Sequence, residues 1–75
     1  MADLITVDPA VMCGKPVVAG TRITVEYVLE QLGNGRSVTE LLEGHPRLTR
    51  EGIEAAIAYA IDALRAERVL AVANG

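Results

Sequence analysis

The spacing of the apolar residues changes once along the chain, near Thr24. Before this position, short β-branched runs are separated by Pro and Gly, which is typical of strands and turns. After it, apolar residues recur at every third or fourth position, as on one face of a helix. The sequence therefore predicts a mostly α (α+β) fold in a single domain over residues 1–75. It has strands and turns over 4–25, three helices over 25–69 and a tail over 70–75.

The N-terminal part contains short extended pieces. Residues 4–7 form the first predicted strand, and Asp8-Pro9 ends it because proline cannot donate a hydrogen bond to a sheet. Residues 17–19 and 23–25 form two more, on either side of a turn at Gly20. A residue without Cβ adopts a positive φ there at little cost, so a small N-terminal β element is expected.

The first two predicted helices are short and begin at residues that can cap them. Thr24 can cap the first, which ends near Gly33, and Ser37 with Glu40 matches a capping box at the start of the second. Gly44 and the following proline end the second helix. The apolar positions of these helices are Val25, Val28, Leu29, Leu32, Leu41 and Leu42.

The third predicted helix is the longest. Thr49 can cap it, and Leu48 and Ile53 occupy the two positions of a hydrophobic staple. Its apolar stripe is widened by alanines at positions 55, 58, 63 and 66, which allows close contact with another helix on more than one side. The stripe consists of Ile53, Ala56, Ile57, Ala60, Ile61 and Leu64.

The chain is small and apolar, and it has no disulfide to stabilise it. It has 75 residues, of which 51% are hydrophobic, and its single Cys13 cannot form an internal disulfide. No Cys/His cluster has zinc spacing, so we expect no metal site. A domain of this size closes its core with little margin, and its mean hydropathy of +0.30 indicates surplus apolar surface. We therefore expect a partner, with a homodimer as one form of it.

Charge and the N-terminal sequence limit the classes of function. The net charge is −3 and the aromatic residues are Tyr27 and Tyr59, so the positive groove and stacking platform of single-strand binders are missing. The chain starts without a basic segment and no apolar run approaches the length of a membrane span. We expect a cytoplasmic protein with no membrane contact.

An ordered series of short motifs runs from residue 4 to about residue 64. It comprises Pro9, Gly14-Lys15-Pro16-Val17-Val18-Ala19-Gly20-Thr21-Arg22-Ile23-Thr24-Val25, Leu29, Gly35-Arg36-Ser37, Leu41-Leu42, Pro46, Leu48-Thr49, Glu51, Ile53, Ala55-Ala56 and Tyr59-Ala60. Together these residues resemble the prokaryotic family called domain of unknown function 433 (DUF433). The resemblance implies a homeodomain-like helix-turn-helix fold. It also implies a role like that of the antitoxins paired with PIN-like ribonuclease toxins, which neutralise the toxin and bind their own promoter.

The sequence departs from the family pattern at three places. Cys13 stands where glycine is usual, and Gly44-His45 stands where an acidic residue and an aromatic often precede the proline. Gly52 replaces a common acidic residue in the first turn of the third helix. Gly52 is expected to lower helix stability by about 1 kcal/mol relative to alanine. It is also expected to remove a negative charge from the surface that would face phosphates.

The candidate DNA-binding residues lie at the turns flanking the second helix, where a helix-turn-helix contacts phosphates. They are Arg36, Arg47, Thr49 and Arg50. The alternative is a solvated helix start in which Arg50 pairs with Glu54. Acidic residues in the same stretch give the two interpretations equal weight. If DNA is bound, its affinity is expected to depend steeply on salt.

The segment around Gly20 is interpreted as a structural turn. Its residues are Gly14, Lys15, Pro16, Gly20, Thr21 and Arg22. A P-loop is rejected because the strand, the spacing and the following Ser/Thr of that motif are missing. In the favoured interpretation, the Thr21 hydroxyl and the Arg22 guanidinium bind neighbouring carbonyls or carboxylates. The alternative is that this segment forms part of a dimer or toxin interface.

Catalysis is not expected from this chain. Cys13 and His45 are its only nucleophile and base, and no third group orients them, so Cys13 is interpreted as a small apolar filler and His45 as a turn residue. No cofactor and no small-molecule substrate are expected.

The end of the third helix is a candidate toxin-binding segment, made of Arg65, Arg68, Val69 and Leu70. Cations here also suit the negative end of the helix dipole, which needs no partner. In the sharper hypothesis an arginine competes with the divalent metal held by the carboxylates of a PIN-like nuclease. The leading interpretation is an antitoxin-like protein that also binds DNA. The alternatives are a DNA-binding regulator without a toxin and a non-catalytic adaptor.

Overall fold

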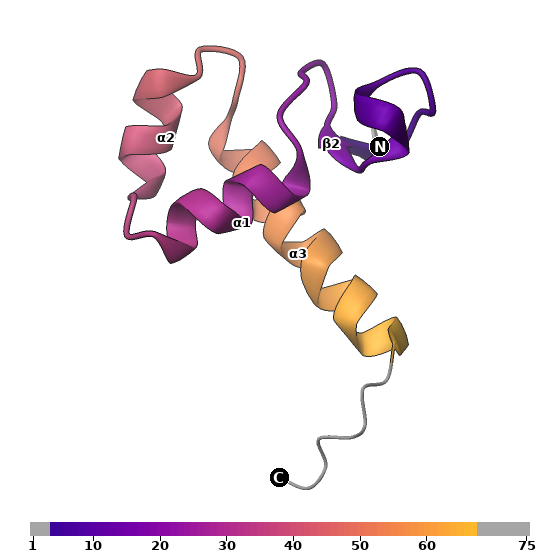
Figure 1. The fold of residues 1–75 in the computed structure, drawn as a ribbon. Helices are drawn as coiled ribbons and strands as arrows, with labels where there is room; N and C mark the ends of the chain where they lie inside the picture. Colours follow the sequence, from indigo (N-terminus) through magenta and orange to yellow (C-terminus); the bar gives the residue numbers. More distant parts are fainter. Residues whose placement is uncertain (1–3, 68–75) are drawn as a thin grey trace, which may run out of the picture.

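The structure is a computed structural model that describes residues 4–67 (Figure 1). Its helical part follows a small N-terminal sheet, so the predicted α+β fold with three helices is confirmed. The elements are β1 (Ile5–Thr6), η1 (Met12–Gly14), β2 (Val17–Val18), α1 (Val25–Gly33), α2 (Val38–Gly44) and α3 (Arg50–Glu67). Residues 68–75, which include most of the predicted toxin-binding segment, lie outside the described residues.

The sheet is a short antiparallel pair. Ile5 is opposite Val18, and Thr6 is opposite Val17. The extended piece predicted over 23–25 is wrong in extent, since it is reduced to a single bridge between Val17 and Thr24. The reason is that α1 begins at the next residue, with the Thr24 hydroxyl accepting a hydrogen bond from the Tyr27 amide at 2.9 Å.

A left-handed turn that the sequence did not predict joins the two strands. Met12, Cys13 and Gly14 have φ values of 50°, 59° and 84°, a region in which side chains with a Cβ are strained. The amides of Gly14 and Lys15 donate to the carbonyls of Val11 and Met12 at 3.1 and 3.2 Å. The interpretation of Cys13 as an apolar filler is wrong, because this surface turn leaves it exposed.

The helix starts agree with the caps predicted from the sequence. Ser37 and Glu40 form the reciprocal capping box, with distances of 2.8 and 3.1 Å. The Thr49 hydroxyl accepts a hydrogen bond from the Gly52 amide at 3.0 Å. Each cap satisfies amides that have no partner within the helix, which fixes where the chain enters α2 and α3.

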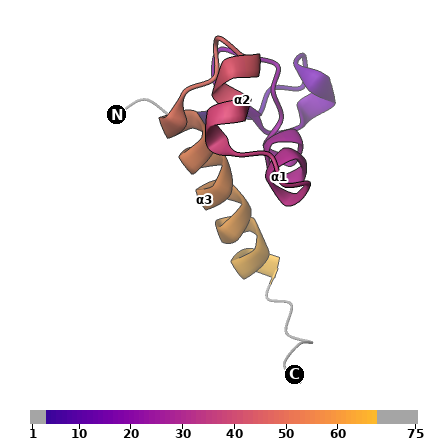
Figure 2. The same cartoon turned by 90° about the vertical axis from the view of Figure 1, so that its left-hand side faces the viewer.

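The core forms where the first half of α3 crosses the other elements. Residues of α3 contact α1, α2 and both strands. Figures 1 and 2 both show α3 running across the body and then away from it. The buried apolar side chains are Val17, Val18, Val25, Val28, Leu41, Leu48, Ile53 and Ala56.

Gly52 is placed inside this core and not on the surface, so the expectation that it affects a phosphate-facing surface is wrong. It is buried, and a Cβ added to it would lie 2.9 Å from Cγ1 of Val18 and 3.3 Å from Oγ1 of Thr49. The absence of a side chain therefore allows α3 to pack directly on β2.

We predict that Gly52→Ala destabilises the protein although alanine favours helix. Overpacking against Val18 is expected to cost more than the gain of about 1 kcal/mol in helix propensity, for a net loss of about 1 kcal/mol. Urea denaturation measures the change. Gly44→Ala is the control, since nothing lies within 4 Å of its Cβ position; equal effects of the two changes would contradict the close packing.

We predict that Cys13→Gly stabilises the protein. Glycine removes the strain of the positive φ at this position, and the net gain is expected to be about 0.5–1 kcal/mol after the greater unfolded-state freedom of glycine is subtracted. The thermal midpoint should rise by about 4 °C. Cys13→Ala removes the thiol but keeps Cβ, so a similar rise in that variant would show that strain is not the cause.

Candidate protein-binding face

The second half of α3 extends beyond the body and exposes apolar side chains. Ile61 and Leu64 are 44% and 61% exposed, although both belong to the apolar stripe predicted for this helix. Every residue from 61 to 66 is exposed. The core-facing side of α3 thus continues into solvent, where no described part of this chain covers it.

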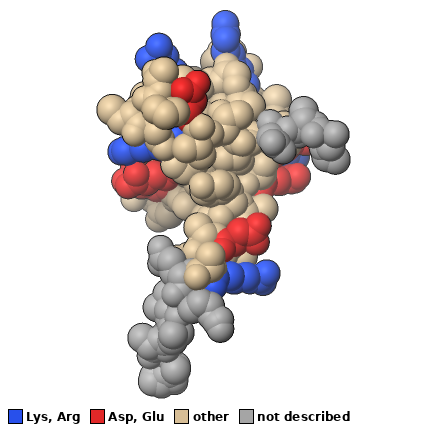
Figure 3. Space-filling view, turned by 90° about the vertical axis from the view of Figure 1, so that its right-hand side faces the viewer, with Lys and Arg blue, Asp and Glu red and all other residues tan. Residues whose placement is uncertain are grey.

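A groove between α1 and this part of α3 forms the candidate binding face. Leu29 of α1 lines one side, and α3 contributes Tyr59, Ala60, Ala63 and Leu64. Figure 3 shows an uncharged area at the centre of the right-hand side of the molecule, with charged side chains around its margins. The apolar wall of the groove suits the side chains of another protein.

Charged residues lie at the rim of this face. The Lys15 ammonium is 3.8 Å from the Glu26 carboxylate, and both residues line the upper end of the groove. The pair is exposed to solvent, so it adds little stability by itself. Arg65, from the predicted toxin-binding set, is exposed on the α3 extension, whereas Arg68, Val69 and Leu70 lie outside the described residues.

The four candidate DNA-binding residues do not form one cluster along the chain. Arg36 precedes α2, whereas Arg47, Thr49 and Arg50 follow it. The Thr49 hydroxyl is already used to cap α3. The predicted pairing of Arg50 with Glu54 is wrong. Within residues 4–66, Lys15 and Glu26 form an ion pair, but Arg50 and Glu54 do not come within 4.0 Å of each other.

The segment around Gly20 forms the predicted turn. Gly20 has a φ of 81°, and the Thr21 hydroxyl donates to the Val18 carbonyl at 2.7 Å and accepts from the Ile23 amide at 2.9 Å. The Arg22 side chain makes no hydrogen bond or ion pair within the described chain, so the prediction that its guanidinium binds a neighbouring carbonyl or carboxylate is wrong. Its guanidinium is available to another molecule.

A side-chain contact between α1 and the α2–α3 connection was not expected from the sequence. The Tyr27 hydroxyl lies 3.1 Å from Nε2 of His45, and the two rings meet edge to face with centroids 5.4 Å apart. His45 also ends α2 as its C-cap residue. The contact therefore fixes the connection that leads into α3, and no local sequence signal links residues so far apart.

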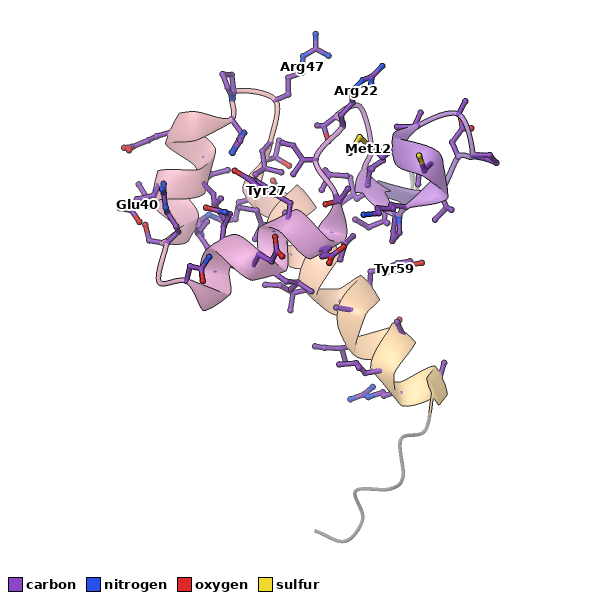
Figure 4. All side chains as sticks on the ribbon, in the orientation of Figure 1. Met12, Arg22, Tyr27, Glu40, Arg47 and Tyr59 are labelled. Atoms are coloured by element: carbon purple, nitrogen blue, oxygen red, sulfur yellow. The ribbon has the colours of Figure 1, made fainter. Side chains whose placement is uncertain are left out.

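Sequence reasoning also missed two residues of the groove. Leu29 belongs to the apolar stripe predicted for the first helix, yet it is 37% exposed, and Tyr59 is 38% exposed on α3. Figure 4 shows Tyr59 pointing outward from the helix. The signal that could have found them is length, because a helix of 9 residues cannot cover one of 18 residues.

Comparison with known proteins connects this fold to a family. Residues 5–60 match the family described as Protein of unknown function (DUF433). The chain belongs to the DUF433 family. The match includes the sheet, α1, α2 and the first half of α3, so the DUF433 resemblance expected from the sequence is confirmed.

Two proteins that resemble this chain are longer than it. A crystal structure of a DUF433 member protein from Anabaena variabilis ATCC 29413 has a TM-score of 0.77 and 32% identity, covering 80% of this chain and 59% of that chain. The uncharacterized protein y4eO of Sinorhizobium fredii (strain NBRC 101917 / NGR234) is 40% identical over 58 residues, which are 77% of this chain and 26% of that protein. The chain therefore spans about a quarter of the length of y4eO.

Residues 4–67 contain neither a membrane-spanning helix nor a metal-binding cluster. None of the helices within residues 4–67 combines the length and the apolar character that a membrane crossing requires. No group of three or more His, Cys, Asp or Glu residues in the same range could hold a metal ion.

Proposed function

We propose that this DUF433 chain is an antitoxin-like protein that binds and neutralises a PIN-like ribonuclease toxin. The observation that supports the proposal is the uncovered apolar side of α3 beyond the body. The groove between Leu29 and Leu64 is the surface on which the toxin packs. Binding alone produces this activity, so the chain needs no catalytic group of its own.

The energetic gain from covering the α3 extension supports a protein partner. Leu64 is 61% exposed and Ile61 is 44% exposed, and covering a side chain such as Leu64 contributes about 1–2 kcal/mol. The alanines of the groove allow a partner helix to approach closely. Apolar side chains aligned on one helix face are a common anchor for such helix packing.

The charges on the helices favour a protein over DNA as the main partner. Glu51 and Glu54 are exposed on the first turns of α3, and Glu40 and Glu43 are exposed on α2. These carboxylates would repel phosphates at the helices that a helix-turn-helix inserts into DNA. We therefore place autoregulatory DNA binding through Arg47 and the start of α3 second to toxin binding.

We expect that Ala63→Asp weakens capture of the toxin, because it places a charge in the apolar groove. The test is co-expression with the product of the adjacent reading frame, followed by co-purification and an assay of ribonuclease activity. Affinity should fall by roughly tenfold or more. Ala58→Asp is the matched control, since Ala58 is exposed on α3 but does not line the groove.

Several outcomes would contradict this assignment. If both aspartate variants capture the toxin equally well, the groove is not the binding surface. If the adjacent product is not a nuclease and no complex forms, the toxin proposal is wrong. A promoter shift by the chain alone, weakening as salt rises, would then favour the regulator, whereas a second copy seated in the groove would give a dimer that Ala63→Asp dissociates.

We further predict that Arg65→Ala combined with Arg68→Ala restores nuclease activity without abolishing the complex. The physical reason is that an arginine blocking the metal-binding carboxylates inhibits the enzyme by charge, while the apolar groove supplies the affinity. Nuclease activity and complex formation are measured on the same sample. Unchanged inhibition would remove these arginines from the mechanism and leave the groove assignment intact.

A further inference from the structure

A second groove lies at the edge of the molecule opposite the α3 extension. It is formed by the segment that follows β1, by the turn after β2 and by the α2–α3 connection. Arg22 and Arg47 line two different sides of it. Figure 4 shows both arginines extending from the same edge of the molecule, although they are far apart in sequence.

The walls that carry these arginines are held in place by hydrogen bonds. On one side, the Val18 amide donates a hydrogen bond to the Ile23 carbonyl at 2.9 Å, and the Thr21 amide donates to the Val18 carbonyl at 3.0 Å. On the other side, the Leu48 amide donates to the carbonyl of His45 at 2.9 Å, and the His45 ring meets Tyr27. The groove is therefore preformed, which lowers the entropic cost of binding.

The groove is a positive site on a protein of net charge −3. Neither Arg22 nor Arg47 has a carboxylate within 4.0 Å in the described chain, because the ion pair found there joins Lys15 and Glu26. Asp8 also lines the groove, but its Oδ1 accepts a hydrogen bond from the Ala10 amide at 2.9 Å. The groove thus carries two guanidinium groups against one carboxylate, that of Asp8, which is already hydrogen-bonded to the neighbouring backbone.

Apolar residues line the same groove as the two arginines. Val11, Val17, Ile23 and Pro46 all line this groove. A ligand that fits must therefore supply anionic groups at the rim and an apolar group on the floor. Carboxylates match the planar guanidinium in a bidentate arrangement, and a peptide can carry carboxylates on either side of an apolar side chain.

We propose that this groove, Arg22 and Arg47 with the apolar floor between them, binds an extended acidic peptide segment of a partner protein. The carboxylates of the segment pair with the two arginines, and an apolar side chain between them packs on Val11 and Ile23, which are partly exposed in the groove. The site is distinct from the α3 groove proposed to hold the toxin.

The surroundings of the groove favour an acidic peptide over nucleic acid. A duplex carries charge continuously along its backbone, and it would meet the exposed Glu51 and Glu54 of α3 as well as the two arginines. The sugar-phosphate backbone that a duplex presents on its outside is also too polar to match the apolar floor. A peptide concentrates its charge locally and satisfies both parts of the groove.

The test is selection of peptides from a random linear library displayed on phage, using the full-length chain as bait. We expect the enriched peptides to carry Asp or Glu on both sides of an apolar residue. Fluorescence polarisation with labelled synthetic copies then measures affinity. Arg22→Ala combined with Arg47→Ala should weaken binding by about tenfold or more, and the affinity should fall as salt is added.

The control is Arg36→Ala combined with Arg65→Ala, which removes the same charge outside the groove and should leave the affinity within about twofold. Circular dichroism verifies that both double variants are folded, as expected for exposed arginines. Ala63→Asp should also retain the peptide, which separates this test from the toxin proposal. The inference is overturned if no acidic peptides are enriched or if both double variants lose affinity equally. It is also overturned if duplex DNA of unrelated sequence binds more tightly than the peptides and depends on Arg22 and Arg47.

Discussion

The close contact between Gly52 and Val18 determines how the rest of the structure is arranged. A Cβ at residue 52 would lie only 2.9 Å from Cγ1 of Val18, so Val18 or α3 would have to shift to make room for it. β2 is itself held between β1 and the bridge to Thr24, so it provides a fixed support. An α-helix of 18 residues is about 27 Å long and straight enough to carry this orientation to its end. One contact near its start therefore sets the direction in which its apolar second half leaves the body.

Local features of the fold could be predicted from the sequence, whereas features that depend on distant contacts could not. Thr24, Ser37 and Thr49 each cap a helix by accepting from the amide three residues later, and such bonds follow from the neighbouring sequence. Gly52 shows only poor helix propensity in the sequence, and its packing role depends on a strand 34 positions earlier. The same limit applies to Leu64, because the helical period indicates an apolar face but not whether another element is long enough to cover it.

The two proposed binding surfaces are separated by the core and differ in chemistry. The groove along α3 is apolar with charges at its rim, whereas the groove between Arg22 and Arg47 combines a positive rim with an apolar floor. Figure 4 places the labelled arginines at one edge of the molecule and the α3 extension at the other. A partner on one surface would not displace a partner on the other. If both proposals hold, the chain would join two proteins, or two segments of one protein, through surfaces that do not overlap.

The family match ends where α3 leaves the body, and this boundary has a physical meaning. Among residues 4–66, every buried core residue falls within the matched range 5–60, whereas residues 61–66 are exposed and add nothing to the core. Substitutions in the extension therefore change what α3 can bind at little cost to folding, while substitutions near Gly52 or Val18 affect the whole domain. The arginine groove lies entirely within the matched part, with one wall on the turn after β2 and another on the α2–α3 connection. Its shape therefore depends on the packing of the core, whereas the apolar face of the extension depends only on α3 remaining helical.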